Sequence, residues 1–446
     1  MNKMYTMSSV EFASQESHEE NNNNDLKNNM DPTTATINMS LSAETFLRAA
    51  ISLKDRVRSG CGEPPTGTDP TLYKGLLGTA FICLRSYEIT GDQHDLQLSA
   101  EIIDTCASVA RDSTRHVTFL CGRGGIYALG AVVANHKGTI TGVTSIWISF
   151  LSFVPIGIAI LPSCRLECSL PAEDRDMAQE KALPVGPEEG GFGMSYDLLY
   201  GRAGFLWAAL FINKCLGPET VPNELLMPIV DAVLAGGRAG ASDNTACPLM
   251  YRWHGTRYWG AASGLAGILQ VLLHFPLSIE DANDVKGTLR YMMINRFPHS
   301  GNYPVSEGNP RDKLVQWSHG APGMAMTLCK ASKVFPSDRE FRDAAIEAGE
   351  VVWKNGLVKK VGLADGSAGN AYSFLSLYGL TGESIYEERA KAFASFLYHN
   401  AEKLVTEGHA GGAEYGYSLF QGLTGTACLW FDLVAPVNSK FPGYEL

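Results

Sequence analysis

The octapeptide QWSHGAPG occupies residues 316–323, and its closing G-x-x-G pattern returns at intervals through most of the chain. Each copy is followed by an apolar run of helical character, such as ILQVLLHF after Gly267. Glycine inside a helix costs about 1 kcal/mol relative to alanine, so a repeated pair requires a shared packing reason. We expect both glycines of a pair to lie on one helix face, where another backbone can approach closely. The seven pairs are Gly75/Gly78, Gly122/Gly125, Gly201/Gly204, Gly264/Gly267, Gly320/Gly323, Gly366/Gly369 and Gly422/Gly425.

The spacing of the glycine pairs predicts a ring of helical hairpins. Successive first glycines are 47, 79, 63, 56, 46 and 56 residues apart, which leaves room for one helical hairpin in each interval. Hairpins that each bury one face on the next form either an open solenoid or a closed ring. Seven hairpins that close give an all-α fold, a seven-hairpin α/α toroid (a double-layered α/α barrel). In such a toroid the glycine-marked ends of the inner helices would converge on a central cleft.

Composition is that of a globular protein with an acidic surface. Of the 446 residues, 45% are hydrophobic and 19% are charged, and the formal net charge is −11. This charge disfavours nucleic acid or an anionic membrane as the main partner. The ten cysteines are scattered, without a C-x-x-C pair, and the N-terminus lacks the pattern of a secretory signal. We therefore expect a cytoplasmic protein, with a peripheral position at the plasma membrane as the alternative.

Two segments depart from the repeat. Residues 1–40 are polar and include an asparagine run at 21–24, which predicts a disordered tail, with a docking or phosphorylation segment as the alternative. Residues 41–446 are expected to form the toroid, interrupted by an atypical apolar insertion at about 140–191. Residues 138–164 carry no charge and are numerous enough to be considered as a transmembrane span. One crossing there would separate two repeats from the other five, which a closed ring does not allow, so membrane association is not favoured.

Six longer motifs accompany the glycine pairs. They are LLYGRAGFLWA (198–208), WHGTRYWGAASGLAGI (253–268), SGNYPVSEG (300–308), LVQWSHGAPG (314–323), GLADGSAGNAY (362–372) and FPGYEL (441–446). These motifs resemble the LanC-like family, the eukaryotic relatives of bacterial lanthionine cyclases, and look most like its plant branch. The resemblance covers about residues 40–138 and 192–446, and it implies the same seven-hairpin toroid.

The resemblance also implies a chemistry. In the family, two cysteines and a histidine hold zinc, and the fourth position is left for a thiol. Zinc lowers the pKa of that thiol and holds the thiolate against an electrophile. The family thiolate adds to a dehydrated serine or threonine, and glutathione is the thiol associated with the eukaryotic members.

The family's zinc-binding positions carry other residues in this chain. Ser318 takes the place of the first cysteine, because the family's WCHG reads WSHG here. Ala364 and Asp365 take the places of the second cysteine and the histidine, because GxCHG reads GLADG. Serine is a poor zinc ligand, alanine is none, and one aspartate does not complete a shell, so we expect no zinc or other cofactor. Ser263 replaces the family's proton-donating histidine, and a serine hydroxyl is a weak general acid near neutral pH.

Several ionisable side chains near the motifs remain as candidates. Asp197 occupies the position of a family acidic residue, and its alternatives are a catalytic role or a cap or internal salt bridge. For the lysines the alternative is a solvated surface, and for His319 it is a hydrogen-bonded residue at a helix end rather than a metal ligand. The candidates for binding a phosphate or carboxylate group are His254, Arg257, Lys313, His319 and the pair Lys359/Lys360.

These observations favour a LanC-like pseudoenzyme with a degenerate zinc site that acts as a non-catalytic binding or signalling component. Glutathione or a phosphopeptide is the expected partner. The first alternative is an active transferase that adds glutathione to dehydrated Ser/Thr sites by positioning alone. The second is a membrane-associated component of plant abscisic-acid signalling. Carbohydrate hydrolysis, known from other α/α toroids, would need two facing carboxylates, for which Asp197 and Asp365 are the pair to nominate.

Overall fold

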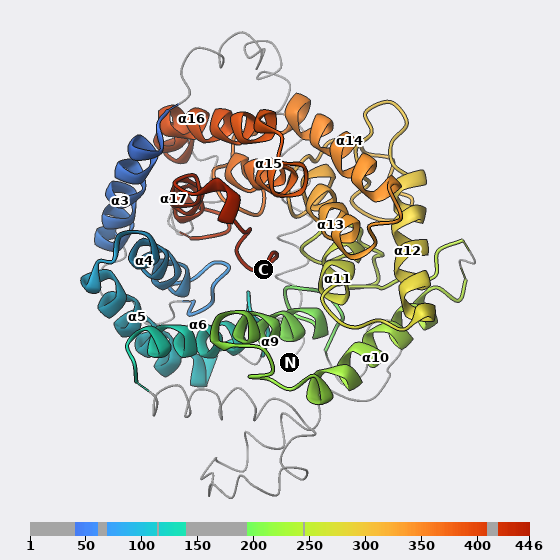
Figure 1. The fold of residues 1–446 in the computed structure, drawn as a ribbon, viewed down its shortest axis with the longest axis horizontal. Helices are drawn as coiled ribbons and strands as arrows, with labels where there is room; N and C mark the ends of the chain where they lie inside the picture. Colours follow the sequence, from blue (N-terminus) through green and yellow to red (C-terminus); the bar gives the residue numbers. More distant parts are fainter. Residues whose placement is uncertain (1–40, 61–68, 114–115, 140–193, 244–245, 408–417) are drawn as a thin grey trace, which may run out of the picture. The chain divides into compact units, whose positions relative to one another are not determined.

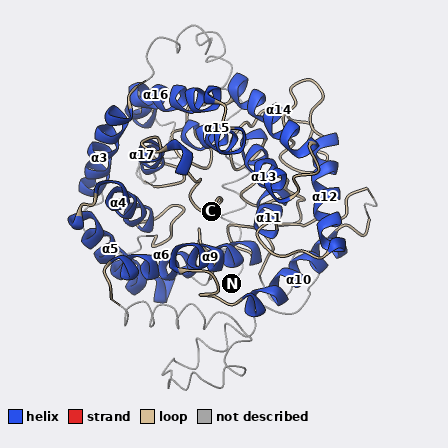
Figure 2. Cartoon of the chain, viewed as in Figure 1, coloured by secondary structure: helices blue, strands red, loops and turns tan. Residues whose placement is uncertain are grey.

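The computed structural model describes residues 41–60, 69–113, 116–139, 194–243, 246–407 and 418–446, which form helices joined by loops and turns (Figure 1). Within these ranges there is no β-strand, only two isolated bridges, as Figure 2 shows in its colouring by secondary structure. The all-α prediction is therefore confirmed. The tail predicted at 1–40 and the insertion predicted at 140–191 both lie outside the described residues. Among the helices that are described, none combines the length and apolar character of a membrane span.

Seven helices form the inner layer of the ring in Ser42–Leu446, and each starts at one of the glycine pairs (Figure 1). For six of these helices the first glycine is the N-cap residue, and the second glycine is the third helical residue. Each inner helix contacts the next, and the last contacts the first, which closes the ring. The inner helices are α4 (Leu77–Thr90), α6 (Arg123–His136), α9 (Arg202–Leu216), α11 (Leu265–Leu272), α13 (Ala321–Val334), α15 (Ser367–Thr381) and α17 (Leu423–Asp432).

The outer layer contains six helices in the described part of the chain, and they alternate with the inner ones along the sequence except between α6 and α9. Each outer helix buries one face, as amphipathic periodicity predicts, whereas an inner helix such as α15 is buried on all sides through most of its length. Outer helix α3 packs against α17, so the first and last described helices join. The outer helices are α3 (Ala43–Gly60), α5 (Gln93–Ser113), α10 (Asn223–Gly240), α12 (Ile279–Ile294), α14 (Glu340–Asn355) and α16 (Ser384–Thr406).

The glycine pairs allow each loop to fold back over the helix that follows it. A Cβ atom added to Gly369 would lie 1.8 Å from the carbonyl oxygen of Leu363, and one added to Gly204 would lie 2.1 Å from that of Leu198. Each carbonyl belongs to the residue six positions earlier in the same repeat. The sequence correctly predicted a close backbone approach, but we expected the approaching backbone to come from elsewhere in the fold. At both glycines the nearest backbone atom belongs to the loop that directly precedes the same helix.

This loop geometry predicts opposite effects for two glycines of the same helix. Gly369→Ala should lower the free energy of unfolding by about 1–3 kcal/mol, because the new methyl group overlaps a carbonyl group. Gly379→Ala, also in α15, should raise it by about 0.5–1 kcal/mol, because its Cβ would meet only the Lys333 ammonium at 4.0 Å. Urea unfolding of both variants measures the difference. Equal stability of the two would show that the loop does not constrain Gly369.

The loops that precede the inner helices are joined to one another by backbone hydrogen bonds. The residue two positions before the first glycine takes part in each of four bonds around the ring. The N–H groups of Tyr73, Phe420, Ala364 and Ser318 donate to the carbonyl groups of Leu120, Tyr73, Phe420 and Ala364 at 2.9, 3.2, 2.7 and 3.0 Å, respectively. These bonds place Ser318 directly beside Ala364.

The C-terminal hexapeptide, residues 441–446, packs inside the ring, where Figure 1 marks the C-terminus. Phe441 and Tyr444 are fully buried, and Phe441 stacks on Trp317 with ring centroids 4.9 Å apart. The Tyr444 carbonyl accepts a hydrogen bond from Gln270 at 2.9 Å, and its hydroxyl lies 2.6 Å from the Thr327 hydroxyl. The chain end therefore ties α11 and α13 together from within.

Candidate functional site

Ser318 lies next to Asp365 at the amino-terminal ends of α13 and α15. The Ser318 hydroxyl donates a hydrogen bond to Oδ1 of Asp365 and accepts one from the Gln316 amide at 3.2 Å. Lys360 Nζ lies 3.8 Å from Oδ2 of the same aspartate. The Ser318 side is buried, whereas the Asp365 and Lys360 side chains are 15% and 26% exposed, so the group can be approached from their side. We call Gln316, Ser318, His319, Lys360 and Asp365 the Ser318 cluster.

The donor atoms at this place do not fit the zinc shell of the family. A zinc site uses thiolate, imidazole or carboxylate ligands, and catalytic sites have three of them. Ala364 is fully buried and has no donor, and the Ser318 proton is committed to Asp365. Lys360 already supplies a positive charge beside the one carboxylate. In the part of the chain that the structure describes, no three His, Cys, Asp or Glu side chains come close enough to hold a metal ion.

His319 is a buried, neutral member of the cluster. Its backbone forms a tight turn with Gln316, through N–H to carbonyl bonds of 3.0 and 3.1 Å in the two directions. Burial lowers the pKa of His319 to about 4, although the charge of Asp365 opposes that shift. The imidazole ring lies 6.0 Å from the ring of Tyr258. A neutral imidazole has one hydrogen-bond donor and one acceptor, but it offers a ligand no positive charge.

The lowered pKa of His319 predicts a loss of stability in acid. Because its folded-state pKa of about 4 lies below the ordinary value of 6.5, the folded chain binds this proton more weakly than the unfolded chain does. The contribution of neutral His319 to the free energy of unfolding is complete above pH 6.5 and is lost as the pH falls from there towards 4. We expect His319→Gln to lose less stability than the native chain between about pH 7 and pH 5 in urea unfolding. His299→Gln, at an exposed position, should follow the native curve, and parallel curves for all three proteins would refute this role.

Asp197 stabilises the turn that leads into α9. One carboxylate oxygen accepts the backbone N–H groups of Leu199 and Tyr200 at 2.9 and 2.8 Å, and the other accepts the Ser195 hydroxyl. The side chain is 2% exposed, and burial raises its pKa although these hydrogen bonds oppose the shift. These bonds stabilise the turn before α9 but do not cap the helix, whose N-cap residue is Gly201 without a side-chain cap bond, and a catalytic role for Asp197 stays a prediction.

The other predicted residues occupy different surroundings. Ser263 is 5% exposed, and its hydroxyl has no hydrogen-bond partner among the described residues, so nothing there activates it as an acid. Arg257 forms an ion pair with Asp243 at 2.6 Å. Lys313 is exposed in the loop before α13, and Lys359 is half-buried next to Lys360 in sequence. The structure thus unites Ser318, His319 and Asp365 but not all of the predicted set.

A set of residues occupies the position directly before the first glycine of each pair, and four of its seven members were missed in the sequence: Lys74, Cys121, Tyr200 and Gln421. Neighbouring members of this set influence one another electrostatically: Tyr200 and Lys74 both act on the pKa of the Cys121 thiol. Burial raises the pKa of Cys121, so it stays a thiol. Aligning the seven repeats on their glycine pairs would have revealed the set, because every residue at this position is polar or a cysteine. The set is Lys74, Cys121, Tyr200, Ser263, His319, Asp365 and Gln421.

A row of aromatic rings reaches the Ser318 cluster. Tyr200 lies 4.9 Å from His116 and is stacked on Trp253 at 6.2 Å. Tyr258 lies 5.8 Å from Trp253 and 6.0 Å from His319. The row crosses from the second repeat to the fifth, and Tyr200 and Tyr258 are only half-buried. It offers flat apolar surface next to polar groups, a combination suited to binding a small organic ligand or a peptide.

A closed ring of seven inner helices, with polar residues at their amino-terminal ends, defines an α/α toroid. The family model described as lanthionine synthetase C-like protein matches residues 66–153 and 163–446. LanC-like protein GCL1 of Arabidopsis thaliana is 63% identical over 425 residues, which are 93% of this chain and 92% of that protein. The chain belongs to the lanthionine synthetase C-like family.

Two further relatives extend this comparison. Glutathione S-transferase LANCL1 of Danio rerio is 33% identical over 387 residues, which are 85% of each chain. Among solved structures, nisin cyclase superimposes with a TM-score of 0.58 at 15% identity, over 89% of this chain and 94% of that chain. This likeness confirms the toroid fold.

Proposed function

We propose that this chain is a metal-independent member of its family that binds a glutathione-like thiol or a modified peptide at the Ser318 cluster without zinc-dependent thiol addition. The observation that carries the proposal is the hydrogen bond from Ser318 to Asp365, two positions where the resemblance to the family implies metal ligands. A thiol bound there would meet a carboxylate, which raises a thiol pKa, instead of a dication, which lowers it. Lys360 offsets that effect only in part, at 3.8 Å from the carboxylate.

Binding remains chemically reasonable at the same place. Glutathione carries two carboxylates and one ammonium group, and the cluster offers the Lys360 ammonium and the Asp365 carboxylate with partly exposed side chains. The aromatic row beside it supplies apolar contact area. The name of the Danio rerio relative supports glutathione as the first ligand to test. We further propose a cytoplasmic binding or signalling role, as the scattered cysteines and acidic charge suggest.

The zinc content of the purified native chain tests the metal-independent reading. We expect well below one zinc per chain after dialysis against a weak chelator, measured by mass spectrometry of the metal. Glutathione binding is measured separately by calorimetry, with Lys360→Met expected to weaken it about tenfold through the loss of one charge-assisted contact. Tightly held zinc at one per chain would overturn the proposal.

The alternative function is glutathione addition without metal, which the named activity of the Danio rerio relative favours. It is tested by following adduct formation between glutathione and a dehydrated phosphopeptide. We expect the native chain to leave the uncatalysed rate unchanged, because the thiol activator and the acid are both replaced. A rate that rises in proportion to protein concentration would establish the alternative.

A further inference from the structure

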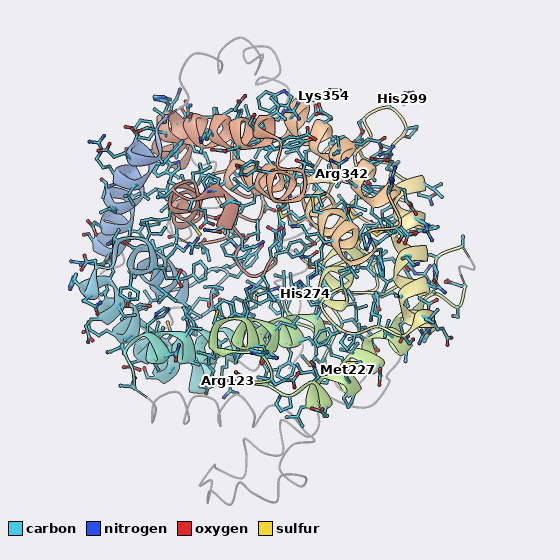
Figure 3. The ribbon with its side chains drawn as sticks, in the orientation of Figure 1. Arg123, Met227, His274, His299, Arg342 and Lys354 are labelled. Carbon is cyan, nitrogen blue, oxygen red and sulfur yellow. The ribbon has the colours of Figure 1, made fainter. Side chains whose placement is uncertain are left out.

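Four lysines gather at the opposite ends of the inner helices from the Ser318 cluster. Lys214 lies in the last turn of α9, Lys330 and Lys333 lie near the end of α13, and Lys440 follows the short 3-10 helix η4 (Pro436–Asn438). His274 lies in the turn after α11, and Figure 3 labels it on the inner side of the ring. The negative end of a helix dipole attracts single cations, but the effect is limited to the last turn and does not account for the half-buried Lys330 next to three other lysines.

The centre of this group is a contact between Lys330 and His274. The Lys330 ammonium lies 3.2 Å from Nδ1 of His274, between two adjacent inner helices. Gln270 and Thr327, which hold Tyr444, precede His274 and Lys330 by about one helical turn each. The pair therefore lies one turn beyond the buried Tyr444, on the side of the helix carboxyl ends.

The four lysines outnumber the nearby Glu445 carboxyl, which offsets only part of their positive charge. In the described part of the chain, none of the four lysines is within ion-pair distance of a carboxylate. The nearby Glu445 carboxyl is buried, and it accepts the Ser376 hydroxyl at 2.7 Å and the backbone N–H of Phe441 at 3.1 Å. Burial and the charges of Lys333 and Lys440 lower the pKa of Lys330 to about 8, although Glu445 opposes the shift. This local excess occurs in a chain whose net charge is −11.

His274 adds a donor without an acceptor. Because Nδ1 accepts from the Lys330 ammonium, the neutral imidazole carries its proton on Nε2. Nε2 is buried, and no described residue accepts its proton. Burial lowers the pKa of His274 to about 3, with Lys330, Lys440 and Lys214 adding to the shift, so the ring is neutral at pH 7.

We propose that Lys330, Lys440 and His274, together with Lys214 and Lys333, form a binding site for a phosphate or phosphate monoester group, either free in solution or in a lipid headgroup. A phosphate dianion presents three acceptor oxygens and so satisfies several N–H donors at once. It would offset the repulsion among the lysines, while Nδ1 of His274 holds the Lys330 ammonium in place at 3.2 Å. The proposal goes beyond the function proposed for the Ser318 cluster and uses none of its residues.

Titration of the full chain with inorganic phosphate at constant ionic strength tests this site. NMR of the histidine side chains reports on His274, and calorimetry gives the affinity. We expect saturable binding that Lys330→Met weakens about tenfold, since one charge-assisted donor is lost. The matched control is Lys354→Met on outer helix α14, an exposed position with the same change of charge, labelled in Figure 3. Its affinity should equal that of the native chain.

A second variant and a vesicle assay complete the test. Lys440→Gln changes an exposed side chain, so it should weaken phosphate binding without affecting folding. Phosphatidylcholine vesicles with and without a phosphatidylinositol phosphate distinguish the sources: binding to the phosphorylated vesicles much tighter than to free phosphate assigns a lipid, and the reverse assigns a soluble ligand. No saturable response to either probe, or equal weakening by Lys354→Met, would overturn the proposal.

Discussion

The triple variant Ser318→Cys, Ala364→Cys and Asp365→His is expected to bind one zinc ion per chain that survives dialysis. The backbone hydrogen bond from the Ser318 N–H to the Ala364 carbonyl oxygen, at 3.0 Å, already holds the first two positions side by side. Asp365 follows Ala364 directly and reaches Ser318 with its side chain. Two thiolates and an imidazole, three strong zinc ligands, would then replace a set of side chains in which only the Asp365 carboxylate is one. A structural zinc site in proteins has a binding free energy on the order of 10 kcal/mol. Metal analysis and competition with a chromogenic chelator measure the gain.

The matched control is the pair Ser318→Cys and Ala364→Cys with Asp365 retained. This variant has two thiolates and a carboxylate in the position of the histidine, so it should bind zinc more weakly than the triple variant. A folded triple variant that holds no zinc would show that the Ser318 cluster does not occupy the family's metal position. That outcome would remove the main support for a metal-independent function.

The same variant separates thiol activation from proton donation. Zinc bound to the triple variant should lower the pKa of bound glutathione and produce adducts on a dehydrated phosphopeptide. Ser263→His, added to it, restores the acid at a buried position. General acid catalysis contributes typically 10²–10⁴-fold, so we expect a further increase of about 10²-fold in the rate of adduct formation. An equal rate with and without the added histidine would assign the proton to another group.

The ring was predictable because its signals are local in sequence. Each glycine pair marks the first turn of one inner helix, and the apolar run after it becomes a helix that is buried on all sides. Periodicity and spacing therefore sufficed for the inner layer. The path of the approaching backbone could not be predicted, since it depends on how each loop folds back: the carbonyl of Leu363 reaches Gly369 over six residues.

Side-chain partners at the site were not predictable for a different reason. Ser318 and Asp365 are 47 residues apart, and they meet because the loops of neighbouring repeats share a backbone hydrogen bond. The sequence indicated which ligands were lost but not that the remaining carboxylate bonds to the new hydroxyl. Asp197 shows the same limit: an acid before a helix was evident, whereas its N–H partners at Leu199 and Tyr200 follow from the turn geometry.

Phe441→Ala is expected to lower the free energy of unfolding by about 3–5 kcal/mol, the range for removing a large buried aromatic side chain. Phe441 is fully buried and stacks on Trp317 at 4.9 Å, with Tyr372 at 5.3 Å and Phe420 at 6.0 Å. These partners belong to the fifth, sixth and seventh repeats. Because Phe441 contacts all three repeats, the cavity left by alanine would loosen them and the closure of the ring at once. Urea unfolding followed by circular dichroism measures the loss.

Val437→Ala provides the local control for this prediction. Val437 lies four residues before Phe441 in η4 and is 66% exposed, so its truncation should change stability by no more than about 0.5 kcal/mol. Phe441→Leu keeps most of the apolar volume and should lie between the two. If Phe441→Ala proved as stable as Val437→Ala, the C-terminal segment would not contribute to stability. Closure of the ring would then depend on the contacts of α17 with α3 and α4 alone. A graded loss in the order Val437→Ala, Phe441→Leu, Phe441→Ala would instead show that the end of the chain holds the ring closed from inside.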